Sequence, residues 1–231
     1  MPFNVEQLRR YPVKSMGGEA LTSIELTARG LVGDRRYAVR DAGDHLVSGK
    51  NSKRFRRHDE IFEFRASTVG GEVLVQHGDA SWPATSPELA GWLTELMGEP
   101  MRVVEDADAS HFDEGSVSLI GTATLEWWRQ RGIDADPRRL RVNIVVETDE
   151  PFEEESWVGS ELVAGGVRLR AVKRVPRCRT VDVPQDGAAA EQKWLKSLAQ
   201  ERDMCAAIYA DVVAPGLVTI GDRLSPGHKR T

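Results

Sequence analysis

The stretch FEFRASTVGGEVLVQHG, residues 62–78, predicts a β-hairpin and sets the expectation for the fold. Two runs rich in valine, threonine and phenylalanine flank Gly70-Gly71, a pair that accepts the positive φ angles of a tight turn. The second run alternates apolar and polar residues, as a strand with one buried face does. TSIELT at 22–27 has the same alternation. Short strands at this spacing predict a small β-barrel or sandwich over the first 80 or so residues.

Helices are expected to be few. SPELAGWLTELMG (86–98) carries a complete set of helix signals, with Ser86 as the cap, Pro87 at the first turn and Gly98 after the last. Further helices are expected over 122–132 and 188–200. We therefore predict a β-rich α+β fold, with one domain over residues 1–100 and a second over 101–231.

Strands are expected to dominate the second half. RVNIVVE (141–147) is too apolar for an exposed edge strand, and CAAIYADVV (205–213) predicts another strand. GVRLRAVKRV (166–175) alternates apolar and basic residues, so its basic side chains should share one face. Cys178 then lies just beyond the end of this strand, on a loop, where sheets often present functional side chains.

The composition of the chain argues against some classes of function and favours another. Of 231 residues, 31 are Lys or Arg and 36 are Asp or Glu, and the resulting net charge of −5 argues against general nucleic-acid binding. No signal peptide and no run of about 20 apolar residues is present, so we expect a cytoplasmic protein without a membrane span. The basic residues cluster locally, which favours a small anionic ligand.

Common cofactor motifs are absent from the sequence. It contains no GxxxxGK[ST] phosphate loop and no GxGxxG turn after a strand. The five histidines form no cluster with the spacing of metal ligands, and two cysteines cannot hold an iron–sulfur cluster. A cysteine–histidine nucleophile assembled in space has no local signature here.

RVPRCRTVDVP (174–184) places Cys178 among positive charges, with three arginines close along the chain and Lys173 just before. A buried structural thiol would gain nothing from such neighbours, whereas a thiolate, as nucleophile or metal ligand, is stabilised by them. The other cysteine, Cys205, is expected to be a small core residue. Both thiols should be reduced in the cytosol.

Three short motifs supply donors for an anion. YPVKS (11–15), GLVGDRR (30–36) and RLRVNIVVE (139–147) bring lysine, arginine, serine and asparagine side chains. Arg141 and Asn143 are expected on the same face of one strand. Each residue taken alone is more often a solvated or surface-paired side chain, because the chain is rich in acidic partners.

These motifs together resemble the MOSC (molybdenum cofactor sulfurase C-terminal) domain preceded by its N-terminal β-barrel domain. The resemblance rests on YPVKS with GLVGDRRYAV, on RVNIVVETDEPFEEESWVG (141–159), on PRCRTVDV (176–183) and on IYADVVAPGLVTIGD (208–222). It covers nearly the whole chain in the family's order. By layout the chain is similar to amidoxime-reducing proteins, although its loop SGKNSKRFRR (48–57) differs from the usual pattern.

The resemblance implies a molybdenum cofactor (Mo-molybdopterin) bound between the two domains. Cys178 would ligate the molybdenum, consistent with the affinity of soft thiolates for such metals, and would be the catalytic residue. The residues expected to grip the phosphate and pterin are Lys14, Ser15, Arg35, Arg141, Asn143 and Arg177.

The expected activity is reduction of an N-hydroxylated or N-oxygenated small molecule. Electrons would come from a separate protein of the ferredoxin, flavodoxin or cytochrome type. Two other readings stay open, because a fold does not fix a function. One is a sulfur carrier or cofactor-delivery module with a persulfide on Cys178, and the other is a relative that has kept the fold and binds nothing.

Overall fold

Strands with alternating buried and exposed residues form a closed barrel, most of which comes from the C-terminal part of the chain. The computed structural model describes residues 2–106 and 111–229. In β15 (Val167–Pro176) every second residue from Val167 to Ala171 is fully buried, while Arg168 and Arg170 are exposed, as the sequence pattern predicts. Seven strands close the barrel among the described residues. Their order is β13 (Ile144–Val146), β12 (Val117–Gly121), β16 (Cys205–Ala214), β15, β14 (Ser160–Ala164), β18 (Arg223–Lys229) and β1 (Phe3–Arg10), which pairs again with β13.

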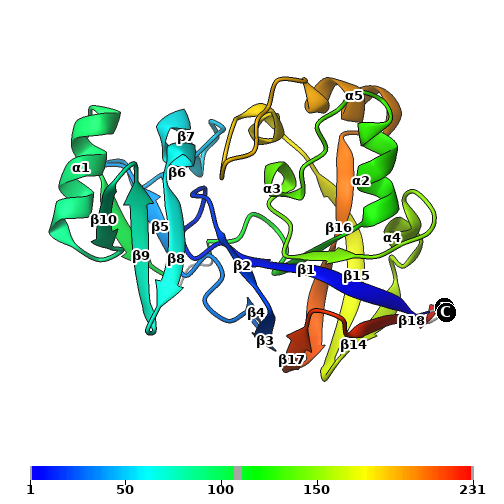
Figure 1. Cartoon of the computed structure of the whole chain (residues 1–231). Helices are drawn as coiled ribbons and strands as arrows, with labels where there is room; N and C mark the ends of the chain where they lie inside the picture. The colour runs from blue at the N-terminus through cyan, green and yellow to red at the C-terminus, as the bar shows by residue number, and fades with distance from the viewer. Residues whose placement is uncertain (1, 107–110, 230–231) are drawn as a thin grey trace.

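The N-terminal lobe is built from two small sheets around its own apolar core. The predicted hairpin is confirmed as β8 (Arg65–Val69) and β9 (Glu72–His77), and β10 (Ala80–Pro83) extends it. The second sheet has the order β11 (Arg102–Glu105), β5 (Tyr37–Arg40), β6 (Leu46–Ser48) and β7 (Phe55–Arg57). Figure 1 shows this lobe beside the barrel, with the helix α1 (Pro87–Met97) on its outer side.

The helix α1 forms where its capping signals predict. The side chain of Ser86 accepts a hydrogen bond from the Leu89 amide, Pro87 starts the helix, and Gly98 takes the left-handed conformation at the end. Leu89 and Leu93 are fully buried against the lobe. The η1 turn (Asp59–Glu63) adds Ile61 and Phe62 to the same core.

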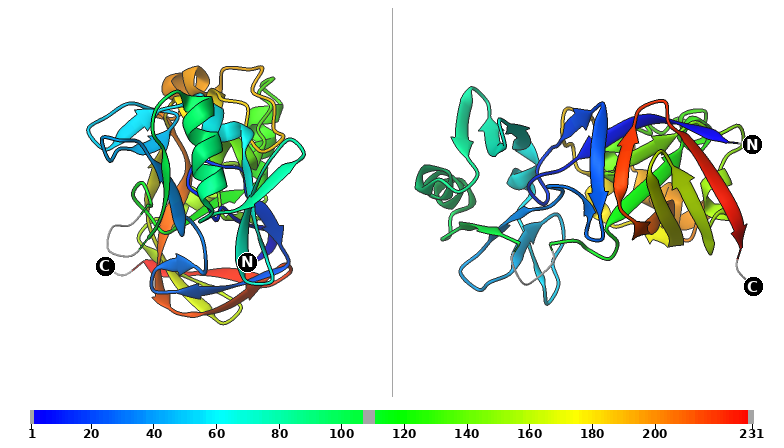
Figure 2. Two further views of the ribbon diagram at one scale, coloured as in Figure 1. Left: turned by 90° about the vertical axis from the view of Figure 1, so that its left-hand side faces the viewer. Right: turned by 90° about the horizontal axis from the view of Figure 1, so that it is seen from below.

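The chain crosses between the two lobes more than once. β1, from the first ten residues, closes the barrel, and β2 (Glu19–Leu21) pairs with it. β3 (Ser23–Thr27) and β4 (Gly30–Leu31) form a sheet with β17 (Gly216–Thr219), from near the other end of the chain. The right-hand view of Figure 2 shows this interleaving beside the barrel. A boundary near residue 100 therefore stays a prediction, since strand pairing does not follow it.

Two helices pack on the outside of the barrel through tryptophan. α2 (Thr122–Arg129) and α5 (Trp194–Glu201) bury Trp128 and Trp194 completely, with ring centroids 6.1 Å apart. The predicted helix over 188–200 was too long at its start, because Gln185 and Ala188 instead form a bridged turn. The other short helical segments are α3 (Pro137–Leu140), α4 (Glu153–Ser156) and η2 (Arg179–Asp182).

The strand expected over 141–147 begins later than predicted. Asp136 caps α3 and Pro137 starts it, and Arg141 ends it in the left-handed region with φ 54°. β13 starts only at Ile144. Arg141 and Asn143 therefore do not share a strand face, and that expectation was wrong. The β-rich α+β fold class itself is confirmed.

Candidate functional site

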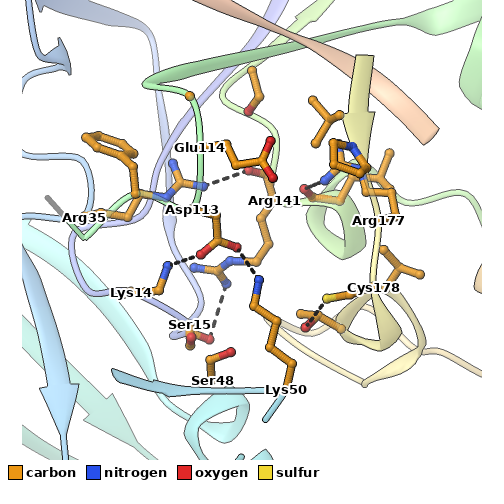
Figure 3. A pocket seen from close by; sticks show the side chains of 18 of the residues that line it. Lys14, Ser15, Arg35, Ser48, Lys50, Asp113, Glu114, Arg141, Arg177 and Cys178 are labelled. Carbon is orange, nitrogen blue, oxygen red and sulfur yellow. Dashed lines mark hydrogen bonds and ion pairs between the residues drawn. The ribbon is translucent and has the colours of Figure 1, made fainter. Parts of the chain in front are cut away.

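A cavity of about 280 Å³ lies where the two lobes meet. Its wall combines residues of the N-terminal motifs with residues from α3, from β12 and from the end of β15. Figure 3 shows these side chains around one central space. The cavity brings together every residue expected at the site: Lys14, Ser15, Arg35, Arg141, Asn143, Arg177 and Cys178.

Three of these residues have backbone conformations that L-amino acids rarely adopt. Ser15, Arg35 and Arg141 have φ angles of 68°, 48° and 54°. A non-glycine residue in this region raises the energy of the folded chain by about 1–3 kcal/mol and persists only when its surroundings impose it. The three come from separate segments yet line one cavity, so part of the strained backbone of the protein lies at the candidate site.

Cys178 follows the end of β15 and precedes the turn η2, as the sequence predicts. Its side chain is half-buried, and Figure 3 shows the sulfur directed into the cavity. The thiol donates a hydrogen bond to Thr180 Oγ1 at 3.3 Å. The cavity therefore contains a thiol whose direction is held by a neighbouring hydroxyl.

The basic residues next to Cys178 in sequence are engaged elsewhere in space. Lys173 pairs with Glu114, Arg174 with Glu155, and Arg179 with Asp59 at 2.6 Å. The alternation of β15 directs its basic side chains outward, away from the barrel interior. Arg177 is the one basic neighbour that lines the cavity with Cys178.

Two arginines of the cavity have no carboxylate partner within the described part of the chain. Arg177 donates to the carbonyls of Leu140 and Ala206, at 2.7 and 2.7–2.9 Å. Arg141 Nη1 makes only long contacts, at 3.4 Å to Ser15 O and 3.5 Å to Gln185 Oε1. Its Nη2 is buried without a partner.

This environment disfavours the charge on both arginines. Burial, reinforced by the neighbouring Arg35, lowers the pKa of Arg141 to about 10. Burial also lowers the pKa of Arg177 to about 10. Two desolvated arginines that form no ion pair among the described residues make a site that an anion would stabilise.

The other two predicted cations of the cavity are paired. Lys14 Nζ contacts Asp113 Oδ1 at 2.7 Å and the His111 carbonyl at 2.8 Å, and Arg35 forms an ion pair with Asp34. Burial lowers the pKa of Lys14 to about 8, although Asp113 opposes the shift. Lys14 therefore changes charge close to neutral pH.

Asn143 lines the cavity, but its amide is fully engaged. Its Oδ1 accepts from the Ser118 amide at 3.1 Å and from Ser118 Oγ at 3.0 Å. Its Nδ2 donates to Asp34 Oδ2 at 3.2 Å and to the Arg9 carbonyl at 3.3 Å. All four hydrogen-bonding positions are used, so here Asn143 acts as a cross-link that orients Asp34. Its assignment to a cofactor stays a prediction.

Tyr11 is a residue of this site that sequence reasoning passed over. Its ring is fully buried, and the guanidinium carbons of Arg141 and Arg35 lie 4.4 and 5.0 Å from its centroid. The hydroxyl donates to the Val142 carbonyl at 3.4 Å. Tyr11 opens the YPVKS motif, so its position in a motif was available as a signal, but an aromatic ring did not suggest an anion site.

The expectation for Cys205 was wrong. Cys205 is partly exposed at the start of β16, and its sulfur contacts only the Asp203 carbonyl, at 3.5 Å, among the contacts described. The strand is buried only from Ala206 to Ile208 and again at Ala210. Cys205 therefore offers a second thiol outside the cavity for comparison with Cys178.

Within residues 2–106 and 111–229, no three His, Cys, Asp or Glu side chains gather as a metal site. Cys178 is thus the cavity's single candidate sulfur ligand. The described residues also include no helix long and apolar enough to cross a membrane.

A β-barrel beside a smaller β-rich lobe, with a thiol and buried cations between them, defines the class of protein. The chain belongs to the MOSC domain family: the MOSC domain matches residues 106–225, and the MOSC N-terminal beta barrel domain matches residues 2–57.

Relatives support this assignment at low identity. Human mitochondrial amidoxime reducing component 2 is 25% identical over 240 residues, covering 82% of this chain and 69% of that protein. The molybdenum cofactor sulfurase of Danio rerio is 22% identical over 249 residues, which cover 83% of this chain but only 30% of the sulfurase. The crystal structure of the YuaD protein from Bacillus subtilis has a TM-score of 0.55 at 14% identity, covering 97% of this chain and 94% of that one, and shows the same fold.

Proposed function

We propose that this chain binds a molybdenum–pterin cofactor in the inter-lobe cavity and reduces N-hydroxylated small molecules, with electrons from a separate redox protein. Relatives named as an amidoxime reducing component and a molybdenum cofactor sulfurase support a link to this cofactor. The proposal rests mainly on one observation, the pair Arg141 and Arg177. Both are half-buried arginines that form no ion pair with a described carboxylate, at the wall that also presents Cys178.

The residues present fit such a cofactor chemically. A pterin dithiolene phosphate is an anion, and the unpartnered Nη2 of Arg141 is a buried donor in need of an acceptor. Lys14 and Arg35 add positive charge on the opposite, N-terminal side of the cavity. Cys178 supplies the soft sulfur that molybdenum accepts as a ligand.

The bound cofactor would supply the two-electron chemistry at its metal. Reduction of an amidoxime consumes two electrons and two protons, forms the amidine, breaks the N–O bond and releases one water. Arg141, Arg177 and Lys14 would hold the phosphate and pterin, and Cys178 would hold the metal. Thr180 would keep the sulfur aimed into the cavity, with its hydroxyl donating to the thiolate across the contact that the thiol now makes.

Molybdenum content tests the proposal directly. The wild-type chain, Cys178→Ser and Cys205→Ser would be produced in a host supplied with molybdate, and the metal measured by ICP-MS. We expect close to one molybdenum per chain in the wild type and in Cys205→Ser, and its loss in Cys178→Ser. Full retention of molybdenum by Cys178→Ser would rule out the ligand role. Turnover of benzamidoxime with a chemical reductant then tests the reaction.

A sulfur-carrier function is the second candidate. The partly accessible sulfur of Cys178 could hold a persulfide, and one relative is named as a cofactor sulfurase. In that case cyanide would release thiocyanate from the wild type and from Cys205→Ser, but not from Cys178→Ser. A chain that carries molybdenum and yields no thiocyanate would exclude this candidate.

A further inference from the structure

The cavity already contains a carboxylate held by two lysines. Asp113, in the segment between β11 and β12, contacts Lys14 Nζ through Oδ1 at 2.7 Å and Lys50 Nζ through Oδ2 at 3.2 Å. Figure 3 shows Asp113 between these two side chains in the central space of the site. Burial alone would raise the pKa of Asp113, but the charges of Lys14 and Lys50 outweigh it and hold the pKa well below its usual range.

Both lysines are positioned by contacts that do not involve Asp113. Lys14 also donates to the His111 carbonyl at 2.8 Å. The Phe55 ring lies beside both ammonium groups, with its centroid 4.4 Å from Lys50 Nζ and 5.2 Å from Lys14 Nζ. The two ammonium groups would therefore stay close together, and would repel each other, if the carboxylate left.

Asp113 is less buried than the group that it neutralises. Its side chain is 42% exposed, whereas that of Lys14 is 9% exposed and that of Lys50 is 30% exposed. A carboxylate at the open side of the cavity can turn into water at little desolvation cost, and an incoming anion can then replace it as the counter-ion of Lys14. The arrangement is thus an anion site with a replaceable occupant.

We propose that Lys14 and Lys50 form an anion subsite of the cavity and that Asp113 occupies it as a displaceable internal counter-ion. The ligand it would take is an oxyanion, such as the phosphate or sulfate group of an incoming molecule. Asp113 competes with this group and so sets the affinity of the subsite. The inference rests on the proposed function only for the identity of the natural ligand.

Sulfate binding tests the competition, because sulfate stays a dianion over the pH range of interest. The cofactor-free full chain would be titrated by NMR at pH 6, where Lys14 keeps its proton, with ionic strength held constant. We expect Asp113→Asn to bind sulfate at least about fivefold more tightly than the wild type, because an isosteric amide no longer competes. Lys50→Met in the Asp113→Asn background should abolish the gain.

Glu114→Gln is the matched control, since it removes a neighbouring carboxylate that pairs with Lys173 instead. It should change the affinity less than about twofold, the size of a general charge effect. Equal or weaker sulfate binding by Asp113→Asn, or a gain that survives Lys50→Met, would overturn the proposal. A gain in Glu114→Gln as large as that in Asp113→Asn would overturn it as well.

A measurement on the wild-type chain guards against a folding defect in the variants. The amide signals of Lys50 and Asp113 should shift with one common dissociation constant as sulfate is added, and an unmoved Asp113 signal would contradict displacement. Because molybdenum content is scored separately, loss of the proposed function and loss of this subsite are distinguishable. Repeating the titration on molybdenum-loaded protein separates the sources: sulfate still bound points to a substrate oxyanion, and sulfate excluded points to the cofactor's phosphate.

Discussion

Replacing Arg141 by methionine should stabilise the ligand-free protein while removing one donor for an anionic ligand from the cavity. In the folded chain burial lowers the pKa of Arg141 well below its ordinary value, to about 10. Because each tenfold change in proton affinity is worth about 1.4 kcal/mol, the charge destabilises the folded state by up to about 3 kcal/mol at neutral pH. The sign follows from linkage: a depressed pKa on a base means that folding disfavours the charged form, so stability rises when the charge is removed.

Part of the gain in unfolding free energy is offset, because the arginine side chain also makes favourable contacts. Arg141 is half-buried, so solvent screens part of the charge, and methionine gives up the contact with the Tyr11 ring. The left-handed φ of 54° is unfavourable for arginine and methionine alike. We therefore expect a net stabilisation of about 1–2 kcal/mol, or a melting temperature raised by about 3–6 °C for a chain of this size. Urea denaturation at pH 7.5, without ligand, measures it.

Arg177→Met is the control, because Arg177 has the same lowered pKa but satisfies buried carbonyls. Its three hydrogen bonds reach Leu140 and Ala206 at 2.7–2.9 Å, and their loss leaves these carbonyls without a donor. Arg177→Met should therefore be less stable than the wild type. If Arg141→Met also proves destabilised, the reasoning from an uncompensated charge is refuted.

Three other measurements probe the same physical terms. Burial raises the pKa of Glu154 from 4.5 to about 7, so its contribution to stability is present below pH 4.5 and falls by about 3 kcal/mol as the pH rises to 7. In denaturation curves Glu154→Gln should remove this pH dependence. Glu150→Gln is the control, because it removes an exposed carboxylate. Because burial lowers the pKa of Lys14 to about 8, the affinity for sulfate should fall above pH 8, by up to about tenfold per pH unit. A sulfate affinity that stays constant from pH 7 to 10 would count against the role of Lys14. Tyr11→Leu should lower the free energy of unfolding by about 2 kcal/mol, while Tyr11→Phe, which keeps the ring beside the arginines, stays close to the wild type. Equal losses in both would show that the ring does not act through the arginines.

Local signals in the sequence were enough to predict the hairpin, α1 and the alternation of β15. Each depends on residues close along the chain, such as Gly70-Gly71 at a turn or Ser86 and Gly98 at the ends of a helix. The prediction of a strand starting at Arg141 was wrong, although the local signals for the helix that precedes it are present in the sequence. Asp136 and Pro137 are themselves a helix start, and the apolar run that follows them concealed it.

The candidate site was predictable as a set of donors but not as a charge distribution. The sequence places Cys178 among four cations, yet pairing with distant carboxylates removes three of them from the site. Asp113 gave no signal, because an acidic residue in an anion site runs against simple charge matching. Its role depends on contacts with Lys14 and Lys50 that join residues far apart in sequence.

The position of β1 has a consequence for how the chain reaches its native state. This strand is synthesised first, yet it pairs with β13, about 140 residues later, and with β18, near the other end of the chain. Pairings of such long range form slowly, because closing a large loop costs chain entropy before any contact is gained. During synthesis β1 therefore remains without β13 until residue 146, and without β18 until residue 224, has emerged. The barrel beside the cavity that holds Cys178 cannot close before β18 is available to join β14 to β1.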